Sequence, residues 1–202
     1  MTETLYGQST VYVVDDDEGV RASLCYLLSK AGWQVQTFAN IESFQKSFDP
    51  DRIGCCIFDL RIGEENGIDL AHYLNSLNSI QPFIFLTGFG TISVAVESMK
   101  LGASHFLEKP VDSTTLLTLV QEAVFNSSQS ANQRVLRFDL IERRNSLSVR
   151  EREVMNLLIE GMLSKQIAAK LGISCKTVEV HKTNLKRKLG VRSTVELLKY
   201  RD

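Results

Sequence analysis

The stretch Thr10-Val11-Tyr12-Val13-Val14-Asp15-Asp16-Asp17 decides how the first part of this 202-residue chain is interpreted. The apolar run at 11–14 has the length and continuity of a buried β-strand. Continuous apolar strands are typical of parallel sheets that are covered on both faces. Three acidic residues then follow at the point where this strand would end. We therefore expect strand 11–14 to lie inside a sheet, with carboxylates gathered at its carboxyl end.

A short apolar run followed by an amphipathic helix recurs along the chain up to about residue 126. This alternation predicts an α/β fold, a doubly wound five-stranded parallel sheet with helices on both faces. Ligands of such open sheets bind beyond the carboxyl ends of the strands, so functional side chains are expected there. Strands are expected at 11–14, 33–38, 55–58, 83–86 and 105–107, and helices at 20–28, 41–48, 68–77, 94–101 and 116–125.

Polar residues that could form one site stand at the ends of several expected strands. The acids 15–17 follow the first strand, Asp59 the third, Thr87 the fourth and Lys109-Pro110 the fifth. Clustered carboxylates repel one another unless a cation lies among them, and their oxygens suit Mg²⁺. A lysine and a hydroxyl nearby could hold an added phosphoryl group by charge-assisted hydrogen bonds. Each residue alone fits a turn, a helix cap or a surface charge equally well, but their matching positions favour a joint site.

The composition is that of an ordinary globular chain, with 44% hydrophobic and 23% charged residues. No apolar run approaches the roughly 20 residues of a membrane helix, so no membrane partner is expected. The first residues, 1–4, lack the basic and apolar regions of a signal peptide, which favours a cytoplasmic location. The cysteines at 25, 55, 56 and 175 lack metal-ligand spacing, and we expect them to be reduced and structural.

The net charge of −1 conceals a strong asymmetry along the chain. Residues 145–202 carry 12 Lys and Arg against 6 Asp and Glu, whereas residues 1–144 carry 11 against 18. A basic unit joined to an acidic body indicates two partners, with nucleic acid favoured for the basic unit. We expect a first domain at 1–126, a linker at 127–145 and an all-α domain at 146–202.

The expected linker is polar at 126–133, and 134–144 has apolar residues at a spacing that allows a short helix. The sequence leaves open whether this linker is a rigid helix or a flexible tether. In the basic domain, Ser148 and Glu151 have the spacing of a capping box. Helices are then expected at 164–171, 174–189 and 193–200, with Gly172 and Gly190 ending the first two.

Two helices around a short turn at 172–174 have the spacing of a helix-turn-helix. On the second helix, Val178, His181, Leu185 and Leu189 form a stripe that we expect to pack inward. Outward Lys and Arg supply attraction to phosphates, and other outward side chains can reach base edges. A charged helix face is often only solvated surface, but the capped turn and the positive charge favour DNA binding. The outward residues are Lys176, Glu179, Val180, Lys182, Thr183, Lys186 and Arg187.

Residues 10–126 resemble the receiver domain of two-component response regulators, which has a flavodoxin-like fold. The resemblance rests on Val-Val-Asp-Asp-Asp at 13–17, Phe-Asp-Leu-Arg at 58–61, Leu-Thr-Gly at 86–88 and Phe-Leu-Glu-Lys-Pro at 106–110. It implies that Asp59 accepts a phosphoryl group from a sensor histidine kinase. It also implies Mg²⁺ binding by Asp15, Asp16, Asp59 and the Arg61 carbonyl, phosphoryl binding by Lys109, a switch pair of Thr87 and Phe106, and a cis Lys109-Pro110 bond.

One part of the receiver pattern departs from the family. Ile62-Gly63 stands after Arg61, where the family usually has Met-Pro. Glycine frees the backbone that proline would fix, so we expect a more mobile loop beside the metal site. The rate or lifetime of phosphorylation could differ for this reason, although the carboxylates and the lysine are all present.

Residues 146–200 resemble the LuxR-type helix-turn-helix of the FixJ/NarL class. The resemblance rests on the stretches 147–154, 165–168 and 177–182. It implies that 174–189 is the recognition helix and that the last helix, around 195–198, helps to pair two copies on DNA. The implied DNA-contacting residues are Lys165, Lys176, Thr177, Glu179, Val180, Lys182, Thr183, Lys186 and Arg187.

Together these features predict a response regulator whose phosphorylation at Asp59 reshapes the face at 92–125. The expected results are a homodimer and tighter, sequence-specific binding to double-stranded DNA, with RNA polymerase as a further candidate partner. The receiver would catalyse only its own phosphorylation and dephosphorylation, so the chain is not expected to be an enzyme. Two alternatives are a phosphorylation-independent regulator with a vestigial pocket, and a small metal-dependent phosphatase or hydrolase, which leaves the basic domain unexplained.

Overall fold

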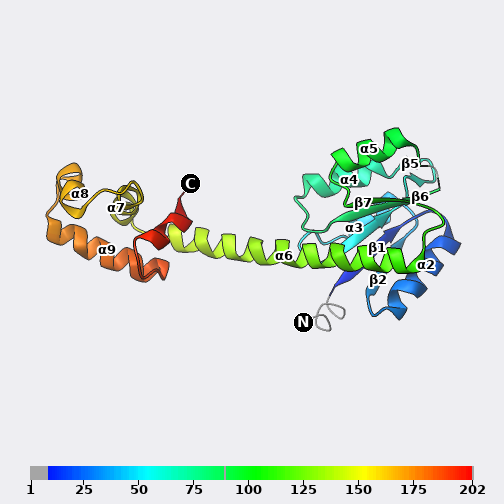
Figure 1. Ribbon diagram of the computed structural model, residues 1–202, viewed down its shortest axis with the longest axis horizontal. Coiled ribbons are helices and arrows are strands. Elements are labelled where there is room, and N and C mark those ends of the chain that lie inside the picture. The colour runs from blue at the N-terminus through cyan, green and yellow to red at the C-terminus, as the bar shows by residue number, and fades with distance from the viewer. Residues whose placement is uncertain (1–8, 89, 202) are drawn as a thin grey trace. The chain divides into compact units, whose positions relative to one another are not determined.

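The computed structural model describes residues 9–88 and 90–201, and the chain divides into two compact units between residues 132 and 133. The first unit contains a five-stranded parallel sheet of order β2-β1-β3-β6-β7 (Figure 1). This order confirms the predicted doubly wound α/β fold. The strands are β1 (Thr10–Val14), β2 (Gln34–Phe38), β3 (Gly54–Phe58), β6 (Phe83–Thr87) and β7 (His105–Glu108).

Helices cover both faces of the sheet, and each face has its own hydrophobic core. Alternate residues of β1 contribute to the two cores: Tyr12 belongs to one and Val13 to the other. The Tyr12 core packs against α3 (Ile41–Ser47), α4 (Ile68–Ser76) and α5 (Ile92–Lys100). The Val13 core packs against α2 (Glu18–Lys30) and α6 (Ser113–Asn145), as the layers in Figure 1 show. Burial on both faces explains why the strands have continuous apolar sequences.

A short antiparallel hairpin follows β3 and was not among the expected elements. Its strands are β4 (Arg61–Ile62) and β5 (Glu65–Asn66). Gly63 lies in its turn with a φ of 64°, a left-handed conformation that glycine adopts without steric cost. The segment in which Ile62-Gly63 predicted a freer loop therefore forms a paired hairpin, and the Ile62 side chain is buried.

The polar segment at 126–133 is helical, because α6 runs without a break from Ser113 to Asn145. Its Ser127 and Ser128 side chains are buried, and the Ser127 hydroxyl oxygen accepts a hydrogen bond from the Gly54 N–H of β3 at 3.1 Å. The short helix expected at 134–144 is the last part of α6. Low apolar content was a misleading sign here, since small polar residues pack this part of the helix.

The second unit is helical, as predicted, and α8 and α9 begin and end where their capping residues indicated. Its elements are α7 (Val149–Ile159), α8 (Ser164–Leu171), α9 (Cys175–Leu189) and the 3₁₀ helix η1 (Val195–Tyr200), which replaces the last predicted helix. Ser148 and Glu151 form the predicted capping box, and the Ser174 side chain caps α9. Gly172 and Gly190 end α8 and α9 in the left-handed conformation.

The second unit has a separate core, in which Met155, Ile167, Val178 and Leu185 are fully buried. This core brings together residues of α7, α8, α9 and η1. Across residues 9–88 and 90–201, no helix combines the length and the apolar character that crossing a membrane requires.

Candidate phosphorylation site and DNA-binding surface

The sheet brings Asp15, Asp59 and Lys109 together. Val14 and Phe58, the last residues of β1 and β3, are paired neighbours, so the next residues, Asp15 and Asp59, lie side by side. Lys109 follows β7, and its Nζ donates hydrogen bonds to Asp15 Oδ2 at 2.5 Å and to Asp59 Oδ2 at 2.6 Å. The residues Asp15 and Asp59 are only 3% and 8% exposed. The structure therefore brings these three strand-end residues together in one pocket.

Backbone groups hold the other oxygen of each carboxylate. Asp15 Oδ1 accepts the Asp17 N–H at 3.0 Å, and Asp59 Oδ1 accepts the Arg61 N–H at 3.2 Å. Burial raises the pKa of Asp15, and the hydrogen bond from Lys109 offsets only part of this shift. Burial alone would lower the pKa of Lys109, but its bonds to Asp15 and Asp59 outweigh burial and raise that pKa. The pocket therefore keeps an ammonium group between two oriented carboxyl groups.

The donor set of the pocket fits a hard divalent cation. Asp15 and Asp59 already share one cationic group, Lys109, which shows that their oxygens converge on a common point. Asp16 is exposed, and the described ranges contain no group of three or more His, Cys, Asp or Glu side chains gathered as metal ligands. Because Mg²⁺ commonly uses only one or two carboxylates and completes its shell with water and phosphate oxygens, this set suits it.

The predicted switch residues Thr87 and Phe106 lie on the neighbouring strands β6 and β7. Thr87 is fully buried, and the partly buried Phe106 ring packs against the core beside Phe85. Gly90 lies between the two switch residues: a Cβ atom there would be 3.0 Å from Phe106 Cε1 and 3.9 Å from Thr87 Cγ2. The structure therefore brings the pair together around a residue that sequence reasoning did not identify.

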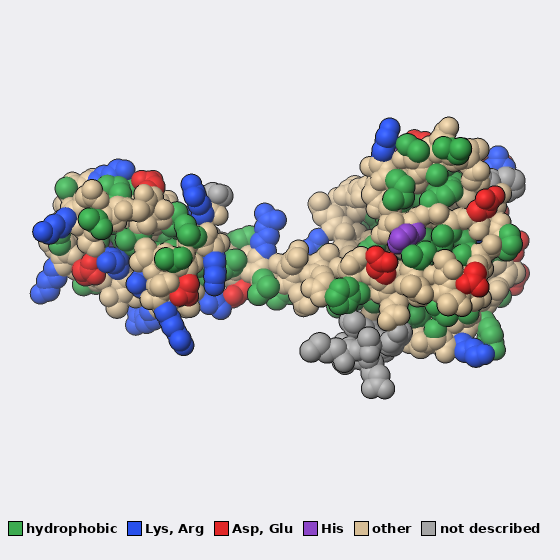
Figure 2. Space-filling model, in the orientation of Figure 1, with side chains coloured by type: hydrophobic (Ala, Val, Ile, Leu, Met, Phe, Trp, Pro, Cys, Tyr) green, Lys and Arg blue, Asp and Glu red, His purple; other side chains and the backbone are tan. Residues whose placement is uncertain are grey.

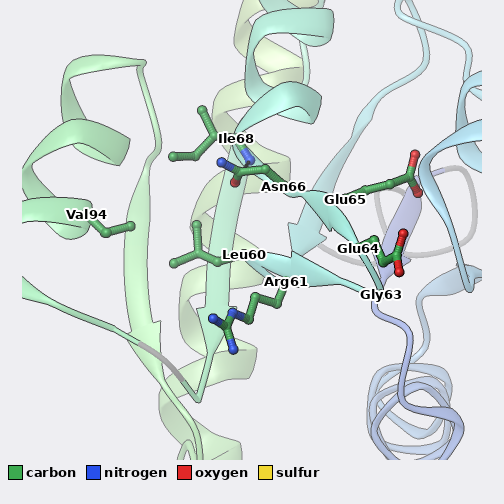
Figure 3. A pocket seen from close by; sticks show the side chains of 8 residues that line it. All are labelled: Leu60, Arg61, Gly63, Glu64, Glu65, Asn66, Ile68 and Val94. Atoms are coloured by element: carbon green, nitrogen blue, oxygen red, sulfur yellow. Dashed lines mark hydrogen bonds between the residues drawn. The ribbon is translucent and has the colours of Figure 1, made fainter.

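The hairpin forms one wall of a cavity of about 530 Å³ beside the Asp59 pocket. Figure 3 shows apolar Leu60, Ile68 and Val94 on one side, whereas Glu64 and Glu65 extend from the other end of the hairpin. Glu65 Oε2 also accepts the Ile41 N–H at 3.3 Å, which ties the hairpin to the start of α3. The cavity therefore lies between the hairpin and Val94 of α5. Its remaining lining residues are Arg61, Gly63 and Asn66.

The helix α9 has the two faces that its sequence predicts. Val178, Leu185 and Leu189 are buried, and His181 is partly buried on the same stripe. In Figure 2, Lys and Arg side chains are numerous on the surface of the unit that contains α9. Of the predicted DNA-contacting residues, those exposed are Lys165, Lys176, Thr177, Glu179, Val180, Thr183 and Arg187, and those partly buried are Lys182 and Lys186.

A hydrogen-bonded cluster joins α8 to this exposed face of α9. Glu179 Oε1 accepts the Ser164 hydroxyl at 2.7 Å and Lys182 Nζ at 2.8 Å. Lys182 Nζ also donates to Ser164 Oγ at 3.1 Å. Sequence reasoning identified Glu179 and Lys182 but missed Ser164, which is 15 residues from Glu179 along the chain. The position of Ser164 at the start of α8 was the available signal, since the two helices of such a motif pack together.

The comparisons with known proteins agree with this geometry. The response regulator receiver domain matches residues 11–121, and the family of bacterial regulatory proteins of the luxR type matches residues 145–200. The chain belongs to the two-component response regulators that regulate transcription through a LuxR-type DNA-binding domain. This class is not catalytic toward external substrates, so the phosphatase or hydrolase alternative is wrong. Receiver domains typically bind Mg²⁺ and are paired with a histidine kinase, and the helix-turn-helix implies DNA as a partner.

Similar proteins extend over nearly the whole chain. The transcriptional regulatory protein FixJ of Azorhizobium caulinodans is 37% identical over 189 residues, which cover 94% of this chain and 90% of that relative. The response regulator protein TodT of Pseudomonas putida is 35% identical over 191 residues, with coverage of 95% and 84%. The solved structure of the response regulator StyR has a TM-score of 0.86, 37% identity and coverage of 96% and 98%. Full-length FixJ from B. japonicum has a TM-score of 0.57 and 36% identity, with coverage of 95% and 94%.

Proposed function

We propose that Asp59 accepts a phosphoryl group from a sensor histidine kinase and that this modification controls DNA binding by the second unit. The observation that carries the proposal is the pair of short hydrogen bonds from Lys109 to Asp15 and Asp59. They hold two carboxylates and an ammonium group within one pocket, which supports a role for Asp59 as the acceptor. In this proposal the receiver is the domain at 1–126, a linker follows at 127–145, and the DNA-binding domain is at 146–202.

In the transfer step, an Asp59 carboxylate oxygen forms a bond to phosphorus while the bond from phosphorus to the kinase histidine nitrogen breaks. Lys109 leaves its direct bond to Asp59 and donates to the phosphoryl oxygens, which stabilises their charge. Asp15, Asp16, Asp59 and the Arg61 carbonyl would hold Mg²⁺, which would supply positive charge next to the transferred group. The backbone N–H of Arg61 orients the Asp59 carboxylate for this step.

The phosphorylated pocket acts on the rest of the receiver through the switch pair. The Thr87 hydroxyl moves toward the phosphoryl group, and the Phe106 ring turns inward. These movements reshape the surface of α5, β7 and α6 within 92–125, where Ile92 is 87% exposed and Val96 and Met99 are also exposed. A homodimer forms through this surface, because apolar side chains exposed together favour association.

On DNA, each copy places α9 in the major groove of one half-site, and η1 helps to pair the copies. Exposed Val195 and Leu198 of η1 support this pairing. RNA polymerase is a further partner, and the cytoplasm is the location in which all of these partners meet. The DNA contacts are made by Lys165, Lys176, Thr177, Glu179, Val180, Lys182, Thr183, Lys186 and Arg187.

The test measures DNA affinity and molecular mass with and without acetyl phosphate and Mg²⁺. The wild type should form a dimer that binds its site more tightly when the phosphodonor is present. Asp59→Asn should remove both effects and leave the fold intact, because the amide cannot accept the phosphoryl group. Asp69→Asn, at an exposed position on α4, is the matched control and should respond as the wild type does.

Equal DNA binding by the wild type in every condition would overturn the proposal. The receiver would then be a scaffold or docking module, as the phosphorylation-independent alternative holds. A phosphate response that persists in Asp59→Asn would show instead that the acceptor is another residue.

A further inference from the structure

Glu179 is an acidic residue in a strongly basic part of α9. Its neighbours on the helix include Lys176, Lys182, Lys186 and Arg187, and its own side chain is 57% exposed. A carboxylate on a surface that faces DNA is repelled by the phosphates, so it reduces the non-specific part of the affinity. We therefore expect the Glu179 carboxylate to make a favourable contact that offsets this repulsion.

The cluster with Ser164 and Lys182 holds this carboxylate in one place. Both donors bond the same oxygen, Oε1, at 2.7 and 2.8 Å. Ser164 belongs to α8, so the carboxylate is oriented relative to the helix pair and not only to its own helix. The Lys182 side chain is only 21% exposed, and it adds a second bond to Ser164. A side chain that is already oriented loses less conformational entropy on binding, and this favours recognition of a specific partner.

The carboxylate is ionised at neutral pH. Hydrogen bonds from Lys182 and then from Ser164 lower the pKa of Glu179 below its ordinary value. An ionised carboxylate has no proton to donate, so it can only accept hydrogen bonds. In the major groove, the groups that can donate to it are the N4 amino group of cytosine and the N6 amino group of adenine.

The surroundings of these two amino groups differ. The adenine N6 amino group lies between two acceptors, adenine N7 and the O4 of the paired thymine, and both repel a carboxylate. The cytosine N4 amino group has an acceptor, guanine O6, on one side only, and the C5–H edge of cytosine on the other. A carboxylate therefore meets less repulsion at cytosine than at adenine.

We propose that Glu179 recognises a cytosine in each half-site by accepting a hydrogen bond from its N4 amino group, and that Ser164 and Lys182 position the carboxylate for this contact. The inference rests on the proposed function in two respects, the placement of α9 in the major groove and the binding of two copies to neighbouring half-sites. Glu179 is the specificity-determining residue, whereas Ser164 acts through it as a positioning residue.

The test selects bound sequences from a randomised duplex DNA library with the full-length protein, in the presence and absence of acetyl phosphate and Mg²⁺. The wild-type pool should contain one position per half-site at which cytosine is preferred by at least about fivefold. In Glu179→Gln that preference should change to adenine, because glutamine can bond adenine N6 and N7 together. Glu153→Gln is the matched control, since Glu153 is a partly exposed glutamate of α7 in an ion pair with Arg150 at 2.8 Å.

Two substitutions of Ser164 test positioning. Ser164→Ala should reduce the cytosine preference about threefold or more while the affinity for random DNA at low salt stays unchanged. Ser164→Thr keeps a hydroxyl and should restore the preference. A purely structural role would change the affinity for all sequences and leave the preference at this one position intact.

The outcomes separate this inference from the proposed function. If Glu179→Gln changes overall affinity but selects the same base at every position, Glu179 is only an intramolecular ion-pair partner and the inference is wrong. If the base change occurs and the wild type binds its selected sequences equally tightly with and without the phosphodonor, the inference stands and phosphorylation control fails. A wild-type pool in which no sequence is enriched under either condition overturns both.

Discussion

Lys109 allows two carboxylates to remain close together in a buried pocket. Moving a carboxylate out of water is costly, and two neighbouring negative charges add repulsion. The Lys109 ammonium lies within 2.6 Å of both Asp15 and Asp59, so each charge has a partner. In the proposed function, phosphorylation of Asp59 would break the contact between Lys109 and Asp59, and a local chemical event would thereby become a structural change.

Gly90 offers a direct test of the switch at the scale of one residue. A Cβ atom at this position would lie 3.0 Å from Phe106 Cε1, closer than normal contact, while its distance to Thr87 is ordinary. The ring lies there while Lys109 is bonded directly to Asp59. Gly90→Ala should displace the ring from this position and raise DNA affinity without phosphodonor several-fold, as measured by fluorescence anisotropy.

Gly88 provides the control for this prediction. A Cβ atom at Gly88 has nothing within 4 Å among the described residues, so Gly88→Ala should leave DNA affinity unchanged. Phe106→Leu removes the ring atoms that Gly90→Ala would contact, and in that background the alanine should have no effect. An equal effect of Gly90→Ala in both backgrounds would show that the ring does not mediate it.

The Glu151–Lys188 pair predicts how the second unit responds to acid. Burial raises the pKa of Glu151, but bonds from Lys188 at 2.6 Å and from Ser148 outweigh burial, and the pKa is lowered overall. The resulting stabilisation is complete above the ordinary pKa of glutamate and is lost as the pH falls through the lower, folded-state pKa. Glu151→Gln keeps the cap but removes the charge. It should lower the free energy of unfolding by about 1–2 kcal/mol at pH 7.

Urea denaturation of wild type and Glu151→Gln over a range of pH checks this prediction. The difference in the free energy of unfolding between the two proteins should disappear once Glu151 is protonated in the folded wild type. Glu153→Gln removes an exposed pair and should cost less than about 1 kcal/mol at any pH. A Glu151→Gln deficit that persists unchanged in acid would mean that packing, and not charge, is responsible.

At the scale of elements, α6 is where sequence and structure differ most. Residues 126–133 have few apolar side chains, which is typical of a linker. Whether such a segment is helical depends on what surrounds it, and here Ser127 and Ser128 are buried within the helix. Helical propensity is a weak indicator compared with a tertiary hydrogen bond of this kind.

The contact between α6 and β3 predicts a specific loss of stability. Ser127→Ala removes the acceptor of the buried Gly54 N–H, which bonds Ser127 Oγ at 3.1 Å. An unsatisfied buried N–H costs about 1–3 kcal/mol. Ser130→Ala changes an exposed serine of the same helix and should not lower the free energy of unfolding. Equal unfolding free energies for the two variants would show that this hydrogen bond contributes nothing.

For the whole molecule, the two units have separate cores, and their stabilities should respond separately. Leu185 is fully buried in the core of the second unit. Leu185→Ala should cost about 2–5 kcal/mol and lower only the thermal transition of that unit. Labelling of Asp59 by acetyl phosphate should stay at the wild-type level. If the substitution also abolishes labelling, the two units fold as one cooperative structure.

Much of the site could be predicted, because strand ends meet at one edge of a parallel sheet. That rule was enough to group Asp15, Asp59 and Lys109 from positions far apart in the chain. Ser164 and Gly90 could not be found in this way. Their importance comes from contacts with Glu179 and Phe106, which depend on side-chain positions that no local pattern contains.

The sequence by itself determined the α/β order of the first unit, the bounds of α8 and α9 in the second, and the grouping of Asp15, Asp59 and Lys109. Hydrophobic periodicity, capping residues and turn glycines act over a few neighbouring residues, so they can be read directly along the chain. Only the tertiary structure decided that 126–133 is helical, that 61–66 forms a hairpin and that Ser164 holds Glu179. Each of these depends on a contact between residues that are far apart in the sequence and close in space, or on a backbone conformation that is stabilised by packing.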